Sequence, residues 1–310
     1  MASFGDLNRV NTNIQSLDSQ LSLNRINRDL SDNQLKLSTG LRINKAEDDA
    51  AGYSIATKLN SRVAGLEQAM QNVGDAKSVL DIAESSFDTV MDNLIEMKSL
   101  STQAANDTLG AEERGYIGDQ ISKLAQDIND VANQTVFQDT ELLNGTSNTG
   151  GVTLTFQVGE RASDTLETTL NAVNVGTLFA GLTAAADAEL GATAGAIVAG
   201  AAGADQGEIT FASTANADDF RSFLSAVDSA IGSMNDRVNE IGMTQSSLSI
   251  REVTLSQSIS ANSSAASRIM DADFAKEQSE SVRLQILQQT STSALAQANN
   301  GPQSVLGFLG

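Results

Sequence analysis

The sequence predicts a mainly α-helical protein: an elongated, coiled-coil-like bundle with paired N- and C-terminal helices, a small β-hairpin and a short variable insert. Two long stretches keep seam residues at alternating spacings of four and three, which is the period of supercoiled helices. They lie on opposite sides of an acidic, glycine-rich middle, so the chain runs out and returns. Proline occurs once, at Pro302, outside both stretches. A helix over residues 220–269 would be roughly 75 Å long, so we expect a rod.

Residues 1–45 are expected to form an N-terminal core helix and a connector. The apolar residues from Phe4 to Leu37 follow one helical row and then, after a phase change, another. The first row holds Leu7, Val10, Ile14, Leu17 and Leu21, and the second holds Leu23, Ile26, Leu30 and Leu37. Gly40 suits the left-handed residue that ends a helix. Asn44, followed three residues later by Glu47, suits the start of the next one.

Residues 46–145 are expected to form the first helices of a rod domain. The long helix should run from about Ala46 to Ala105, with Asp48 and Asp49 in its first turn, where the positive helix end favours acidic residues. Its seam is Leu59, Arg62, Leu66, Ala69, Val73, Ala76, Leu80, Ala83, Phe87, Val90, Leu94, Met97, Ser101 and Ala104. A turn at residues 106–110 leads to a third helix with Ile117, Ile121, Leu124, Ile128 and Val131 at the same spacing.

The middle of the chain changes pattern. Alternation in Val152, Leu154, Phe156 and Val158 predicts a β-hairpin within residues 146–174. Residues 175–218 are rich in Ala, Gly and Thr and have weak periodicity, so we interpret them as a small variable surface insert.

The rod domain's return helix is expected over residues 219–270. Its seam is Phe220, Leu224, Val227, Ile231, Met234, Val238, Ile241, Gln245, Leu248, Glu252, Leu255, Ile259, Asn262, Ala266 and Ile269. The polar members Gln245, Glu252 and Asn262 either fix the register between helices or mark a solvent-facing gap, and both readings stay open. Residues 271–310 form the C-terminal core helix, which we expect to end at Gly301-Pro302; its apolar residues are Phe274, Val282, Leu284, Ile286, Leu287 and Leu295.

Composition argues against an enzyme. The chain has no cysteine and no histidine, which removes thiol nucleophiles, imidazole bases and most zinc chemistry, so neither a catalytic site nor a cofactor nor a metal is expected. Asp48 and Asp49 alone suit a helix start better than acid-base work. The net charge of -20 argues against nucleic acid and anionic membranes as partners. Neither a cleaved signal peptide nor a membrane-inserted segment is predicted.

Several motifs together resemble a known family. They are Gly40-Leu41-Arg42-Ile43-Asn44, Asp48-Asp49-Ala50-Ala51-Gly52, Asn133-Gln134-Thr135, Leu142-Leu143-Asn144-Gly145, Phe156-Gln157-Val158-Gly159, Ser263 with Ala265-Ala266-Ser267-Arg268-Ile269, Leu295-Ala296-Gln297-Ala298-Asn299 and Pro302-Gln303-Ser304-Val305-Leu306. In order and spacing they resemble the terminal blocks of bacterial flagellin, here as a short form with a reduced central region. The resemblance spans residues 1–145 and 219–310.

The resemblance implies a structural subunit that self-assembles into the helical flagellar filament for swimming, outside the cell, after export without a cleaved signal peptide. It implies as partners other copies of the chain, the filament cap, hook-associated proteins, the flagellar secretion apparatus and an export chaperone at the C-terminal segment. An alternative is a hook-filament junction protein of related architecture. Innate receptors contact many flagellins at the positions of Glu96, Leu100 and Gln120; the family's Arg and Glu are replaced by Glu96 and Gln120, so receptor activation is not predicted.

Two sets of residues are therefore candidate assembly sites. An amphipathic helix without a partner is marginal in water, so we expect the terminal helices to become ordered on polymerisation. The candidate polymerisation interface is Leu7, Val10, Ile14, Leu17, Leu21, Ile26, Leu30, Leu284, Ile286, Leu287, Leu295, Val305 and Leu306. The candidate rod seam is Leu66, Val73, Leu80, Phe87, Leu94, Ile231, Val238, Ile241, Leu248, Leu255 and Ile259.

Overall fold

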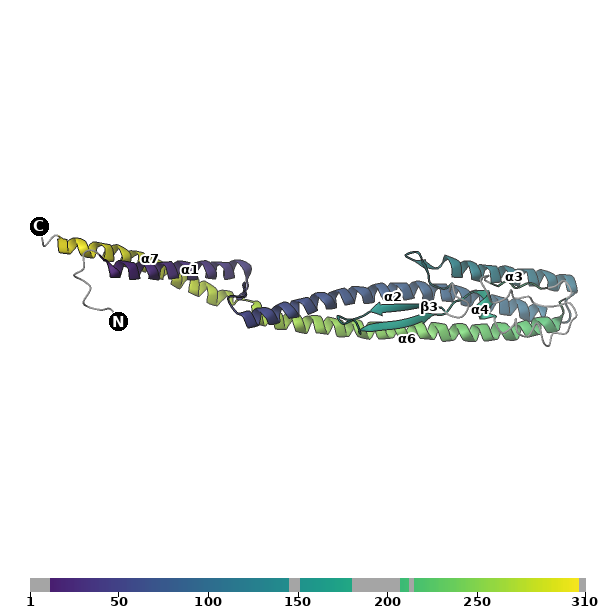
Figure 1. The fold of residues 1–310 in the computed structure, drawn as a ribbon. Coiled ribbons are helices and arrows are strands. Elements are labelled where there is room, and N and C mark those ends of the chain that lie inside the picture. Colours follow the sequence, from purple (N-terminus) through teal and green to yellow (C-terminus); the bar gives the residue numbers. More distant parts are fainter. Residues whose placement is uncertain (1–11, 145–150, 180–206, 212–214, 307–310) are drawn as a thin grey trace. The chain divides into compact units, whose positions relative to one another are not determined.

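The computed structural model describes residues 12–144, 151–179, 207–211 and 215–306, and for residues 301–306 it describes the backbone only. The predicted mainly helical class is confirmed, with long helices and two small antiparallel sheets (Figure 1). The elements are α1 (Ile14–Thr39), α2 (Ala50–Ala104), α3 (Ala111–Gln134), β1 (Val136–Phe137), β2 (Thr140–Glu141), β3 (Val152–Gln157), β4 (Thr165–Leu170), α4 (Val175–Leu178), α6 (Ala217–Met270) and α7 (Phe274–Leu306). They divide into two compact units, residues 1–64 with 258–310 and residues 65–257.

In the first unit, α1 and α7 lie side by side and run in opposite directions (Figure 1). The chain segments that lead out of α1 and into α7 are tied together by an antiparallel bridge between Leu41 and Asp271. The amide of Ala272 donates to the carbonyl of Gly40 at 2.9 Å, and Gly40 ends α1 with a φ of 72°. The predicted left-handed glycine cap is therefore confirmed, and it turns the chain directly into this bridge.

The start of α2 differs from the prediction. The helix begins at Ala50, four residues later than expected, and Asp49 precedes it, with its Oδ1 accepting the amides of Ala51 and Gly52. Asp48 instead accepts the amides of Asn44 and Lys45 with its Oδ2. The predicted capping box of Asn44 and Glu47 is therefore wrong. Because Asp48 holds the preceding segment in a turn, the helix cannot extend back through it, and Asp49 takes the helix-start role.

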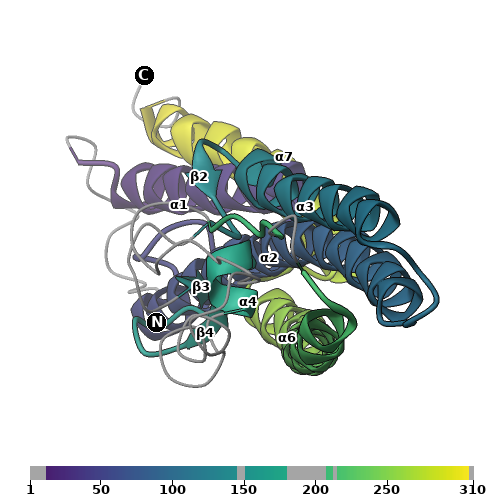
Figure 2. The same cartoon turned by 90° about the vertical axis from the view of Figure 1, so that its right-hand side faces the viewer.

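The core of the second unit lies between α2, α6 and α3. Every predicted α2 seam residue from Leu66 to Ala104 is buried, whereas Leu59 is half-buried and Arg62 is exposed. The buried seam residues of α6 in this unit are Phe220, Val227, Met234, Ile241, Leu248 and Leu255, and Leu224, Ile231 and Val238 are half-buried. In the part of α6 that belongs to the first unit, Ala266 is buried, and Ile259 and Ile269 are half-buried. From α3, Ile117, Ile121 and Ile128 are buried as well. Figure 2 shows α3, α2 and α6 nearly end on.

The predicted hairpin is β3 and β4, with Val152 paired to Leu170 and Gln157 to Thr165. It lies against both long helices: Asn72 of α2 donates to the carbonyl of Gln157 at 3.1 Å, and the hydroxyl groups of Thr168 and Thr244 lie 3.4 Å apart. A second, unpredicted hairpin joins β1 to β2. Its two turn residues are not glycine, although both have positive φ, 46° at Gln138 and 65° at Asp139.

Both ends of the expected insert, residues 175–218, contain residues that belong to the core rather than to the surface. Val175 and Phe179 near its start, and Ile209 near its end, are buried. Phe179 stacks on Phe223 with ring centroids 5.6 Å apart, and Phe211 stacks on Phe220 at 4.6 Å. Residues 180–206, most of the expected insert, lie outside the described residues.

The three polar seam residues of α6 lie at the edge of the packed core. Gln245 donates to Asp81 and Glu84 of α2, and Glu252 forms an ion pair with Lys77 at 2.8 Å. Asn262 donates to the carbonyl of Ser258 in its own helix. The first two therefore link the helices while remaining partly exposed, which combines the two readings that the sequence left open.

Candidate self-association surface

The pairing of α1 with α7 uses the second apolar row of α1. Along α1, every third or fourth residue is less exposed to solvent than its neighbours: Ser16, Ser19, Leu23, Ile26, Leu30, Asn33 and Leu37. On α7 the less exposed residues are Glu277, Ser281, Leu284, Gln288, Ser291, Leu295 and Ala298. Both series have the alternating spacing of a coiled-coil seam. The two helices therefore pack as an antiparallel coiled coil.

This seam is unusually polar. The buried residues of the pair include Asn33 and Ser281 beside Leu284 and Ala298. Polar links run along its length: Asn33 donates to Glu277, Gln288 to Asn27, and Ser16 to Asn299. Since few large apolar side chains are fully buried here, the pairing of α1 with α7 gains little from the hydrophobic effect.

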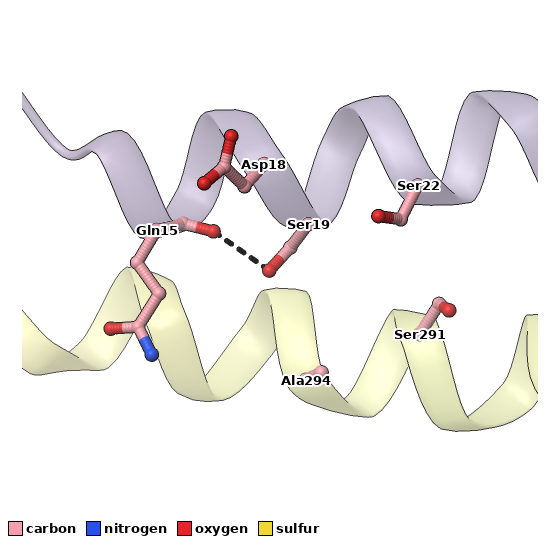
Figure 3. Close-up of a pocket in the computed structure, with 6 residues that line it drawn as sticks. All are labelled: Gln15, Asp18, Ser19, Ser22, Ser291 and Ala294. Atoms are coloured by element: carbon pink, nitrogen blue, oxygen red, sulfur yellow. Dashed lines mark hydrogen bonds between the residues drawn. The ribbon is translucent and has the colours of Figure 1, made fainter. Parts of the chain in front are cut away.

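Near the free ends of the pair lies a cavity of about 270 Å³, drawn in Figure 3. Its lining is small and polar: Gln15, Asp18, Ser19 and Ser22 come from α1, and Ser291 and Ala294 from α7. The hydroxyl group of Ser19 donates to the carbonyl of Gln15 at 2.7 Å within α1. No convergent charged groups line the cavity, so we assign it to loose helix packing rather than to a ligand.

The first apolar row of α1 lies outside the seam. Leu17 and Leu21 are 57% and 59% exposed, and Ile14 is 37% exposed. On α7, Ile286 is 59% exposed, and Val282, Leu287 and Phe274 are exposed as well. These large apolar side chains face away from the seam, so they form a candidate surface for association with a further partner.

The candidate interface residues thus divide into groups. Ile26, Leu30, Leu284 and Leu295 lie in the α1·α7 seam, and Ile14, Leu17, Leu21, Ile286 and Leu287 lie on the outward surface. Leu7 and Val10, and the side chains of Val305 and Leu306, lie outside the described residues. Of the three positions at which innate receptors were considered as a contact, Glu96 and Gln120 are exposed and Leu100 is half-buried.

Sequence reasoning missed a second apolar surface, on α6. Met243, Ile250 and Val253 are 68%, 66% and 58% exposed. Met243 and Ile250 are seven residues apart and hence on one side of the helix, a spacing that could have been noticed beside the stronger seam. On α3, Tyr116 is exposed too.

The electrostatics of the first unit centre on the turn before α2. Two backbone amides, those of Asn44 and Lys45, hold the pKa of Asp48 below its ordinary value. Within the described residues, no group of three acidic side chains is arranged to bind a metal ion, and none of the helices could span a bilayer.

Comparisons with known proteins agree with this geometry. Residues 10–148 match the bacterial flagellin N-terminal helical region, and residues 224–309 match the bacterial flagellin C-terminal helical region. A flagellin from Bacillus subtilis (strain 168) is 34% identical over 314 aligned residues, which cover 97% of this chain and 99% of the relative. The flagellar filament 33 kDa core protein of Treponema phagedenis is 31% identical over 301 residues, with 97% and 99% covered.

A fold likeness extends to a solved structure from Vibrio parahaemolyticus that is described as a flagellar hook-associated protein. The TM-score is 0.51, and the match covers 72% of this chain and all of that one. At 14% sequence identity this likeness concerns the fold alone.

Proposed function

The chain belongs to the bacterial flagellin family, and on this basis we propose that it is the subunit that polymerises into the helical flagellar filament used for swimming. Family membership makes it a structural protein and not an enzyme. The finer proposal is that the outward surface of the α1·α7 pair is buried against neighbouring copies and that the terminal helices become fully ordered in that process.

One observation carries the proposal: the leucines and isoleucines of α1 and α7 that face away from the seam. Leu17, Leu21 and Ile286 are each more than half exposed. Burying one such side chain contributes roughly 1.5–3 kcal/mol. Ordering each residue costs about 1–2 kcal/mol of conformational entropy, and the polar seam alone offsets little of that cost. Apolar area buried against other copies would therefore stabilise the helices.

The experiment measures the critical concentration for polymerisation by sedimentation and electron microscopy. In the variant Leu17→Ser with Leu21→Ser, the loss of two buried leucines should raise that concentration roughly a hundredfold or more. The matched control is Gln20→Ser with Asn24→Ser, which changes two exposed polar residues of the same helix. If the leucine variant and the control polymerise alike, the outward surface is not the interface.

We further propose that an export chaperone binds the C-terminal segment before the chain passes through the flagellar secretion apparatus. In the extracellular filament the chain would then meet the filament cap and hook-associated proteins. The fold likeness to a hook-associated protein supports a second candidate, a junction protein that caps a filament instead of propagating it. Electron micrographs after seeding separate the two: a propagating subunit lengthens the seeds, whereas a junction protein decorates only their ends.

A further inference from the structure

Asn33 occupies the most protected position on α1. It is 4% exposed and is the one residue of this helix in the buried class within the part that the structure describes. Its apolar neighbours along the seam, Ile26, Leu30 and Leu37, are only half-buried. The centre of burial on this helix is therefore an amide.

The amide group is only partly satisfied. Its Nδ2 donates to the Oε2 of Glu277 at 2.7 Å and to the backbone carbonyl of the same residue at 3.1 Å. Its Oδ1 is buried without a hydrogen-bond partner, and no other side-chain atom in the described residues shares that condition. A buried acceptor that gives up water and gains no donor opposes the folded arrangement.

The other polar links along α1·α7 carry no such penalty. Asn13 uses its carbonyl oxygen and its amide group, and the pair of Gln288 and Asn27 lies at an exposed edge. Leucine at the position of Asn33 would remove the buried acceptor and would suit a seam that already holds Leu30 and Leu37. A single asparagine in a coiled-coil seam lowers stability for this reason.

We propose that Asn33 keeps the α1·α7 pair of the solitary chain below the stability that the seam could reach, so that full closure requires the area supplied by a second copy. This inference rests on the proposed function for its biological sense. Its physical content is narrower: Asn33 lowers the stability of the pair within one chain, while the bridge between Leu41 and Asp271 holds the two helices in place.

The test is amide hydrogen exchange, followed by mass spectrometry on the full-length chain below its polymerising concentration. Asn33→Leu should slow exchange in the α1 peptides by about tenfold, equivalent to ~1.4 kcal/mol. The matched control is Asn24→Leu, the same exchange of side chains at an exposed position of the same helix, which should slow exchange by less than about twofold, consistent with a change of intrinsic helix propensity alone. A second variant, Asn33→Ala, removes both the buried acceptor and the hydrogen bonds to Glu277 and should leave exchange unchanged or slower.

Three results would overturn the inference: faster exchange in Asn33→Leu, unchanged exchange in that variant, or an equal slowing in Asn24→Leu. Faster exchange in Asn33→Ala would also overturn it, because the hydrogen bonds to Glu277 would then outweigh the unpaired oxygen. Seeded polymerisation of the parent chain is measured separately. A parent that polymerises while the exchange comparison fails removes only this inference, and a parent that does not polymerise removes the proposed function.

Discussion

Nδ2 of Asn13 donates a hydrogen bond of 2.8 Å to the backbone carbonyl of Ala298. In a regular α-helix that carbonyl accepts from the amide four residues later, which here is Pro302 and has no N–H. The Oδ1 of the same asparagine accepts the amide of Ser16 and thereby caps the start of α1. One side chain thus satisfies an unpaired donor of α1 and an unpaired acceptor of α7.

Asn13→Ala should therefore weaken both helix ends. Loss of a cap costs about 1 kcal/mol, and the carbonyl of Ala298 loses its partner as well. Asn13→Asp keeps the cap and loses only the donor, so it should be the milder change. Amide exchange of residues 14–20 and 294–301 measures the two ends separately. Equal effects of both variants on the α7 peptides, with no effect of Asn13→Asp on those of α1, would fit this account; faster exchange confined to α1 in both variants would contradict it.

The same contact explains why the expected end of the last helix is wrong. A helix ending at Gly301-Pro302 was predicted because proline breaks helices, yet α7 continues to Leu306. The hydrogen bond that α7 loses at Pro302 is replaced by the one that Nδ2 of Asn13 donates to the carbonyl of Ala298. A contact between residues 285 positions apart leaves no signal in the local sequence.

The α2 seam, by contrast, could be predicted because one strong stripe fixes which side of a helix is buried. The first helix offered two stripes. Both contain large apolar residues, Leu17 and Leu21 in one and Ile26 and Leu30 in the other. The structure shows that α7 packs against the second, although that stripe also contains Ser19 and Asn33. Which stripe is used depends on the partner helix and on the bridge at Leu41, and neither can be read from periodicity.

Leu94 and Ile95 are adjacent on α2 and test the seam directly. Leu94 is fully buried, whereas Ile95 is 53% exposed. Leu94→Ala should lower the free energy of unfolding by about 2–5 kcal/mol through lost burial and a cavity. Ile95→Ala should change it by no more than about 0.5 kcal/mol. Chemical denaturation of the full-length chain measures both, and similar losses in the two variants would mean that α2 does not bury this face.

Asp48 makes the turn before α2 sensitive to acid. The amides of Asn44 and Lys45 lower its pKa, so the ionised form stabilises the folded turn. This stabilisation is complete above the unfolded pKa of about 3.9 and is lost as the pH falls through the lower, folded pKa. Asp48→Ala should cost about 0.5–1 kcal/mol at pH 7, a small figure because the carboxylate is exposed to solvent.

The measurement for Asp48 is a pair of thermal melts of parent and variant, at pH 7 and below pH 3. The difference in melting temperature should shrink at the lower pH, where the parent's carboxylate is protonated. Glu47→Ala serves as the control, since the amides of Asn44 and Lys45 donate to Asp48 and not to this neighbouring exposed carboxylate, so the variant should show little difference at pH 7. A difference for Asp48→Ala that stays constant with pH would exclude the ionised carboxylate as its cause.

Asn129 of α3 joins the two segments that border residues 180–206. Its Oδ1 accepts the amide of Val175 at 2.9 Å, and its Nδ2 donates to the carbonyl of Gly207 at 2.8 Å, in a buried site. Asn129→Ala leaves both backbone groups without partners, at about 1–3 kcal/mol each, so we expect a loss of about 2–4 kcal/mol by chemical denaturation. Asp130→Ala, at the adjacent exposed position, should have little effect.

Amide exchange adds a local test: in Asn129→Ala, residues 175–179 and 207–211 should exchange faster than the helix interior of α2. Because the stacked phenylalanines would still hold these segments against α6, the faster exchange should stay local; a uniform increase across the second unit would show that Asn129 supports the helix bundle as a whole rather than the base of the insert.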